Sequence, residues 1–251
     1  MRETTRTAIL TGIMAIGLTA LMSGSALAEE KPEAGLTMGA YSQYVWRGYA
    51  FSDSSVVIQP SMTVAYKGFG VNLWGNLDTD YDDGTSKGIN WNETDMTISY
   101  DGSAGKIGYG IGWIYYNLGS ELGADSQEVY AGVSVDTLLA PTLTIYNDID
   151  NFRGYYATLG ISHSIPVAEG LTLDLGAQIG YYDLDDTNYS EFHDGLVSAA
   201  MTFAINDYVS VTPELYYSFA LTNEAEADII AVSSDGDDDH IYGGVSASFA
   251  F

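Results

Sequence analysis

Apolar and polar residues alternate with a period of two along most of this chain, from Leu36 to Phe251. Between positions 58 and 66, for example, Ile58, Met62 and Val64 share one parity, with polar or small residues between them. A period of two places successive side chains on opposite faces of a β-strand. No segment shows a sustained helical period, so we expect an all-β fold with no helix after the N-terminal segment.

Twelve such runs can be marked as candidate strands. They lie near residues 36–47, 56–66, 69–78, 91–100, 107–118, 127–136, 142–150, 154–165, 171–182, 195–205, 208–219 and 241–251. Most are about 10 to 12 residues long, the length that a tilted strand needs to cross a bilayer. Twelve is an even number, as in single-chain bacterial barrels. Because 142–150 and 154–165 are weakly separated, ten or fourteen strands are the alternative counts.

The connections between these runs alternate in length. Short ones lie at 67–68, 101–106, 137–141, 166–170 and 206–207, and longer, mostly acidic ones near 48–55, 79–90, 119–126, 183–194 and 220–240. Outer-membrane barrels combine short periplasmic turns with long extracellular loops. We therefore expect six outward loops and five inward turns, with both ends of the barrel on the periplasmic side.

Aromatic residues on the apolar parity favour a membrane barrel over a soluble one. Those near the strand ends are Tyr66, Phe69, Tyr100, Trp113, Tyr115, Tyr155, Tyr181, Phe203, Tyr217, Phe219, Phe249 and Phe251. Lipid-facing rings gather in this way at the two membrane interfaces. A soluble β-sandwich or lipocalin-like barrel would carry lysine along its water-facing parity, and no lysine lies clearly inside a strand here. The predicted fold class is a transmembrane antiparallel up-and-down β-barrel of about twelve strands.

Both ends of the sequence indicate export. Basic Arg2 and Arg6 precede an apolar stretch at 9–22 and a small-residue cleavage pattern that ends at Ala28, as in a secretory signal peptide. The last strand finishes on Phe251, similar to the terminal signal by which outer-membrane barrels are inserted. We expect a bacterial outer-membrane protein whose partners are membrane lipid, lipopolysaccharide and the barrel-insertion machinery. The expected parts are a signal peptide at 1–28, a short periplasmic segment at 29–35 and the barrel at 36–251.

Composition excludes several function classes. The chain has a formal net charge of −26, which repels nucleic acid and attracts cations. It contains no cysteine, so disulfides and cysteine-based catalysis or metal binding are excluded. With 46% hydrophobic and 13% aromatic residues, it is too apolar for a disordered chain.

Charged residues on the polar parity are the candidate lumen groups. Arg47 is the only arginine within a predicted strand, and an inward guanidinium needs an acidic partner, for which Glu93 and Asp95 are the expected choices. The other candidates are Glu128, Tyr130, Asp174 and Glu214. These side chains form either a selectivity constriction or a plug that stabilises a narrow barrel. Both interpretations stay open.

Several short motifs resemble a known family. They are Tyr44–Gly48, Gln59–Pro60, Phe69–Asn76, Glu93–Asp95, Trp113–Tyr116 and Gln127–Ser134. With order and spacing kept over about residues 36–182, they resemble the TorF-like family of outer-membrane porins. The resemblance implies a porin with Arg47, Glu93, Asp95, Glu128 and Tyr130 at matching positions. The long acidic loops depart from the family pattern and leave the solute open.

Catalysis on this barrel is not expected. A serine nucleophile would need an adjacent histidine base, and the only histidines are His163, His193 and His240. No His-x-Ser pair lies on one face of a predicted strand. We therefore predict that the chain is not an enzyme.

No cofactor is expected, and the loop acids form only a candidate site for Ca²⁺ or Mg²⁺. They are Asp78, Asp80, Asp82, Asp235, Asp237 and Asp239. Spaced carboxylates suit hard cations, but none of these runs matches a calcium-loop consensus. A solvated, charge-repelling surface is therefore the favoured interpretation.

The predicted function is an outer-membrane channel for passive diffusion of small cationic or neutral polar solutes. The alternative is a structural or adhesive surface barrel with a closed lumen and acidic loops that bind divalent cations. Twelve strands can enclose a narrow pore or a core of side chains, so the sequence leaves this choice open.

Overall fold

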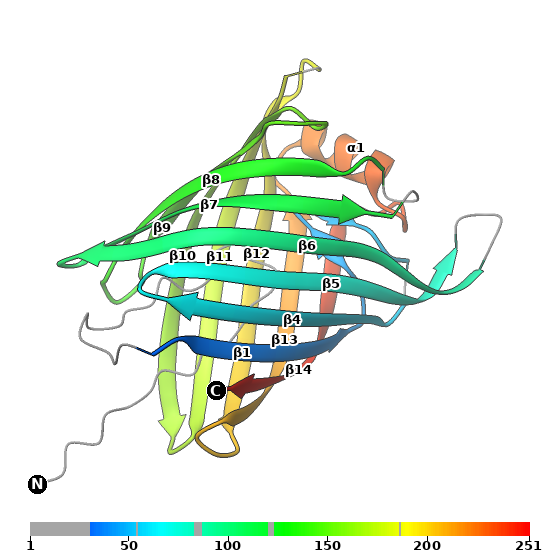
Figure 1. The fold of residues 1–251 in the computed structure, drawn as a ribbon. Helices are drawn as coiled ribbons and strands as arrows, with labels where there is room; N and C mark the ends of the chain where they lie inside the picture. Colours follow the sequence, from blue (N-terminus) through cyan, green and yellow to red (C-terminus); the bar gives the residue numbers. More distant parts are fainter. Residues whose placement is uncertain (1–30, 54, 83–86, 120–122, 186) are drawn as a thin grey trace, which may run out of the picture.

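Twelve strands close into one antiparallel barrel in the computed structural model, which describes residues 31–53, 55–82, 87–119, 123–185 and 187–251 (Figure 1). The wall strands are β1 (Glu33–Tyr41), β4 (Val57–Tyr66), β5 (Phe69–Asp82), β6 (Lys87–Ala104), β7 (Ile107–Leu118), β8 (Ser126–Val135), β9 (Thr142–Asp148), β10 (Gly154–Ala168), β11 (Leu171–Leu184), β12 (Ser190–Ala204), β13 (Val209–Ala220) and β14 (Asp239–Ala250). Each pairs with its neighbour in the chain, and β14 closes on β1. The predicted fold class and strand count are confirmed. The predicted signal peptide at 1–28 lies outside the described residues.

The two parities of the wall strands face opposite environments. Apolar side chains exposed on the outside include Met62, Leu73, Ile98, Ile111, Val133, Leu159, Leu175 and Val245. Buried polar side chains such as Gln59, Asn76, Thr144 and Ser246 point inward. An apolar outer surface around a polar interior is the arrangement of a transmembrane β-barrel.

Short turns and long loops lie at opposite ends of the barrel. Gly35, near the start of β1, pairs with Ala250 at the end of β14, so both ends of the described barrel lie together. The other end carries the long loops and the helix α1 (Asn223–Val232), visible in Figure 1.

The helix α1 corrects the expectation that no helix follows the N-terminal segment. Thr222 caps it, because its side-chain oxygen accepts a hydrogen bond from the backbone N–H of Ala225, and Glu224 and Glu226 lie in the first turn, where the helix dipole favours acids. Among the described residues, no helix is long and apolar enough to cross a membrane.

The first strand is shorter than predicted. It ends at Tyr41 instead of continuing to residue 47, and residues 42–53, here called the plug segment, fold into the lumen. Within this segment β2 (Val45–Trp46) and β3 (Tyr49–Ala50) form a two-stranded hairpin that does not belong to the wall. The apolar residues of the plug segment become buried on both faces, which a place in the wall would not allow.

Candidate functional site

The turn of the plug hairpin is set by two residues with positive φ. Val45 pairs with Ala50 and Trp46 with Tyr49, which leaves Arg47 and Gly48 as a two-residue turn with φ values of 49° and 86°. Positive φ at both central positions defines the type I′ turn, which matches the twist of a hairpin. Arg47 therefore lies at the tip of the plug segment.

Arg47 forms a two-pronged ion pair with Glu128 of β8. Its Nη1 and Nη2 atoms donate to Oε1 and Oε2 of Glu128 at 2.8 and 2.7 Å, and the two side chains are only 7% and 4% exposed. The hydroxyl of Tyr116 donates to the same carboxylate at 2.8 Å. Burial acts to lower the pKa of Arg47, but Glu128, Tyr116 and Tyr182 together raise it well above its ordinary value, so the guanidinium stays charged.

A row of tyrosines surrounds the guanidinium. Tyr146, Tyr156 and Tyr182 lie at paired positions of β9, β10 and β11. The Arg47 Cζ atom lies 4.9, 4.3 and 5.9 Å from their ring centroids and 4.2 Å from that of Trp46. Tyr130 extends the row onto β8. Aromatic faces attract a cation, most strongly where water is excluded.

The end of the plug segment near α1 is held by the last long loop. The Tyr49 hydroxyl donates to Asp228 at 2.7 Å, and the amide of Ala50 donates to the Ser233 hydroxyl at 3.1 Å. The side-chain amide of Gln43 donates to Asp235 at 2.6 Å. Burial, together with the hydrogen bond to Asp228, raises the pKa of Tyr49 well above its ordinary value, so its hydroxyl stays a donor.

His193 of β12 holds the backbone of the turn. Its Nε2 atom lies 3.1 Å from the carbonyl oxygen of Arg47, and its Nδ1 atom pairs with the Tyr189 hydroxyl. Because a carbonyl can only accept, Nε2 is the protonated nitrogen. The histidine thus fixes the position of the turn by a hydrogen bond from its Nε2–H group to the Arg47 carbonyl oxygen.

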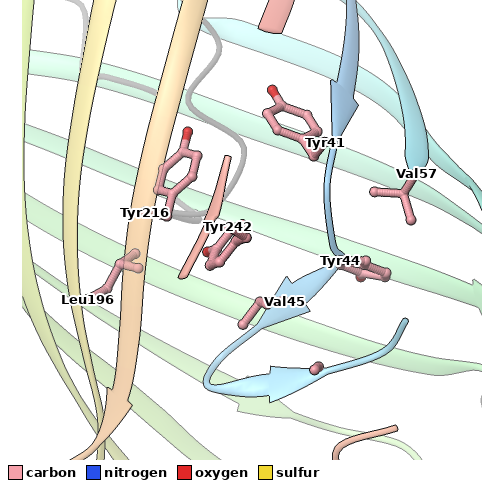
Figure 2. Close-up of a cluster of buried hydrophobic side chains, with 8 residues drawn as sticks. Tyr41, Tyr44, Val45, Val57, Leu196, Tyr216 and Tyr242 are labelled. Atoms are coloured by element: carbon pink, nitrogen blue, oxygen red, sulfur yellow. The ribbon is translucent and has the colours of Figure 1, made fainter. Parts of the chain in front are cut away.

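The other flank of the plug segment packs on apolar side chains of the wall. Figure 2 shows Tyr44 and Val45 of this segment with Leu196, Tyr216 and Tyr242 of the wall in one buried cluster. A cavity of about 10 Å³ remains there, enough for about one water. A larger cavity of about 280 Å³ lies beside the plug segment, against β5 and β6. In this conformation side chains of the plug segment and of the wall pack against one another inside the barrel.

The predicted partners of Arg47 are wrong. Glu93 and Asp95 lie two positions apart on β6 and face the plug segment near Tyr44. The pairing differs because Arg47 belongs to an inward turn and not to the wall, so its side chain extends to β8 instead of the nearby β6. Within the described part of the chain, Glu93 Oε2 and Asp95 Oδ1 are buried and lack a well-formed hydrogen bond.

The remaining lumen candidates separate into two groups. Tyr130 belongs to the tyrosine row beside Arg47. Glu214 is buried elsewhere and accepts hydrogen bonds from Tyr41, Tyr216 and Ser246. Asp174 pairs with the Ser164 hydroxyl in the half of the barrel with the short turns. Neither acid contributes to the Arg47 cluster.

The loop acids do not converge on a common point. Within the described part of the chain, no three side chains of His, Cys, Asp or Glu form a possible metal site. Asp80 pairs with Lys87, Asp235 with Gln43 and His240, and Asp239 with the Tyr217 hydroxyl. Asp78 is buried and accepts from the Asp80 amide, and the Asp237 amide donates to Asp235. The side chain of Asp82 lies outside the described part.

The histidines have partners other than serine. His163 pairs with the carbonyl oxygen of Leu138, and His240 with Asp235. Over the described ranges, no histidine ring shares a hydrogen bond with a serine hydroxyl. A serine–histidine pair of the kind that activates a nucleophile is therefore not formed by these residues.

Sequence reasoning missed most of the surroundings of Arg47. Tyr155 and Tyr181 were assigned to the apolar parity, which places Tyr156 and Tyr182 on the inward parity, so these two could have been found. The Arg47-Gly48 dipeptide resembles the Lys67-Gly68 turn, and both adopt the same backbone, with φ values of 49° and 86° against 52° and 86°. That similarity was the available signal for the hairpin.

Comparison with known proteins supports the fold. No family model matches this chain, and no curated protein matches it in sequence. The NanC porin aligns with a TM-score of 0.55 and 10% identity, over 86% of this chain and 98% of the porin chain. An outer membrane channel from Pseudomonas putida F1 aligns with a TM-score of 0.51 and 12% identity, over 89% and 97%. The chain thus has the fold of an outer-membrane channel barrel.

Proposed function

We propose that this protein is a channel of the bacterial outer membrane that admits small cationic or neutral polar solutes. The observation that carries the proposal is a polar lumen narrowed by an inward-folded segment, inside a barrel with an apolar outer surface. Porin and channel structures share this barrel fold. The plug segment narrows the lumen, and solutes pass either when it shifts or along the cavity beside it.

The charge of the lumen favours cations. Of the lysines and arginines in the described ranges, Arg47 alone is not exposed. The acidic side chains buried with it are Asp78, Glu93, Glu128, Asp148, Asp194 and Glu214. An anion entering this interior would be desolvated beside acidic side chains that outnumber the single buried cation, whereas a cation would be attracted to them.

The outer face and the loops agree with an outer-membrane location. The exposed aliphatic belt would contact lipid, and the aromatic residues near the strand ends would lie at the two interfaces. The pattern at 1–28 would direct export as a cleaved signal peptide, and the final strand would be recognised by the barrel-insertion machinery. The acidic loops would face lipopolysaccharide, where divalent ions can bridge like charges. The motifs that resemble those of the TorF-like porins support the same proposal.

A catalytic role is not proposed. The buried histidines hold structural hydrogen bonds, and His193 is used to fix the plug turn. The alternative function is a surface barrel with a permanently closed lumen. It is favoured by the close packing of the plug segment.

Conductance in a planar bilayer separates the two functions. We expect single-channel events from folded protein, and a reversal potential under a KCl gradient that shows preference for K⁺ over Cl⁻. Preference for Cl⁻ would refute the charge argument. Absence of conductance from folded, inserted protein would favour the closed barrel.

A further inference from the structure

The group that holds the Arg47 guanidinium is built almost entirely by the barrel wall. Glu128 comes from β8, Tyr116 from β7, and Tyr146, Tyr156 and Tyr182 from β9, β10 and β11. Only Trp46 belongs to the plug segment itself. The wall therefore presents this arrangement whether or not the plug segment occupies it.

The arrangement is specific for a planar, forked cation. Both oxygens of Glu128 are aligned with two guanidinium nitrogens at 2.8 and 2.7 Å, and Tyr116 fixes the carboxylate from the other side at 2.8 Å. A parallel pair of hydrogen bonds matches a guanidinium and not an ammonium group. The Tyr156 and Trp46 rings, with centroids 4.3 and 4.2 Å from Cζ, supply aromatic faces for a flat cation.

The tyrosines are themselves held in place without Arg47. The hydroxyl of Tyr156 donates to Asp194 at 2.8 Å, and the rings of Tyr146 and Tyr182 pack against Tyr156 with centroid distances of 6.2 and 5.3 Å. Removing the guanidinium would therefore leave a preformed pocket with one uncompensated carboxylate. Such a pocket binds a ligand at low cost in ordering its side chains.

We propose that this wall site is a binding site for solutes that carry a guanidinium group, and that Arg47 occupies it in cis as a tethered competitor. A free alkylguanidinium that takes the place of Arg47 on Glu128 would remove the side-chain contact between the tip of the plug segment and β8 and leave the His193 hydrogen bond to hold the turn. This proposal rests on the proposed channel function and names the solute class of the same lumen.

The structure offers a matched pair of variants for the test. Arg47→Asn removes the guanidinium but keeps the turn, because Asn-Gly is the preferred pair of a type I′ turn. Lys67→Asn is the matched control, because it also replaces a basic residue by asparagine before a turn glycine. The β4–β5 turn has similar φ values and lies far from Glu128 in the barrel. Arg47→Lys is the second variant, since Lys67 shows that a Lys-Gly pair adopts this turn.

Binding is measured on folded protein in detergent by titration calorimetry with methylguanidinium chloride, and with methylammonium chloride at equal ionic strength. We expect Arg47→Asn to bind methylguanidinium saturably and about tenfold or more tightly than it binds methylammonium, because only the former is bidentate. Wild type and Lys67→Asn should bind methylguanidinium at least about tenfold more weakly, since Arg47 fills the site. The affinity of Arg47→Lys for methylguanidinium should lie between those of Arg47→Asn and wild type.

A further variant assigns the binding to Glu128. Arg47→Asn combined with Glu128→Gln should lose saturable binding. Equal binding by wild type and Arg47→Asn, equal binding of the two cations, or binding that survives Glu128→Gln would each overturn the proposal. Because the titration needs no ion flow, its failure is distinct from a failure to conduct in the bilayer.

Discussion

The guanidinium of Arg47 and the carboxylate of Glu128 meet inside the barrel although 81 positions separate them in the chain. Each is almost fully buried, and two N–H groups of the guanidinium donate to the two oxygens of the carboxylate. The pair joins a loop-derived hairpin to the wall at one point, while α1 holds the hairpin from another side. The position of the plug segment therefore depends on contacts that are remote in sequence.

Breaking this pair from the wall side is expected to destabilise the barrel. Glu128→Gln leaves Arg47 buried without a counter-charge, which costs about 3 to 5 kcal/mol, and less where water enters the lumen. Arg47→Asn combined with Glu128→Gln should be more stable than Glu128→Gln alone. The free energies of unfolding of wild type, both single variants and the double variant, measured by urea unfolding in detergent, form a double-mutant cycle. We expect this cycle to give an interaction free energy of about 1 to 3 kcal/mol between Arg47 and Glu128. If the losses of unfolding free energy in the two single variants simply added up in the double variant, Arg47 and Glu128 would have no net interaction.

Gly48 is expected to tolerate no side chain. Its φ is 86°, and a Cβ atom would lie 3.0 Å from Ile229 Cδ1 and 3.2 Å from Asp194 Cβ. Gly48→Ala should cost the left-handed backbone penalty, roughly 1 to 2 kcal/mol, and in addition force the Ile229 and Asp194 side chains to shift by a few tenths of an ångström. Gly105→Ala is the control. Gly105 has a φ of 65° and open space around it, so this variant should be destabilised by the backbone penalty alone. Equal melting temperatures for the two variants would contradict the packing argument.

The strands of the wall could be predicted from the sequence because the alternation of apolar and polar residues can be recognised within each strand by itself. Each strand repeats one rule, apolar outward and polar inward, and a residue such as Met62 or Leu175 satisfies it with no knowledge of distant partners. Closure and strand order then follow from short connections between neighbours. For this reason all twelve wall strands were found, with errors only at their ends.

The plug segment could not be predicted in the same way. The strict alternation already breaks after Tyr41, where Ser42 and Gln43 are both polar and Tyr44 to Trp46 are all apolar, but the local sequence does not show where such a segment folds. The choice is decided by contacts with Glu128 and Ile229, which lie far along the chain. The helix α1 was missed because its acidic residues were assigned to a charged loop, although Thr222 provided a cap signal.

Tyr49 predicts a pH dependence of stability. Burial and the bond to Asp228 raise its folded pKa above the unfolded value near 10, so its contribution is full below about pH 10 and is lost as the pH rises toward the folded pKa. Tyr49→Phe should therefore show a smaller loss of melting temperature between about pH 9 and 11. Tyr208→Phe, at an exposed position, should match wild type. If melting temperature fell equally with pH in wild type, Tyr49→Phe and Tyr208→Phe, Tyr49 would not be the source of the pH dependence.

Movement of the plug segment can be tested with a reversible cross-link, because the chain has no cysteine of its own. Ala50 lies against the loop after α1. Its amide donates to the Ser233 hydroxyl at 3.1 Å, and its carbonyl oxygen accepts from the Ser234 amide at 2.8 Å. A disulfide between Ala50→Cys and Ser233→Cys should therefore form with little rearrangement.

If passage of solutes requires the plug segment to shift, the oxidised double variant should conduct K⁺ at a small fraction of the wild-type level. Dithiothreitol should restore conductance within the same bilayer. Each single cysteine variant serves as a control and should respond to neither oxidant nor reductant. Full conductance from the oxidised, cross-linked protein would place the ion path beside the plug segment, along the cavity against β5 and β6. In that case the plug segment would line a fixed pore instead of closing it.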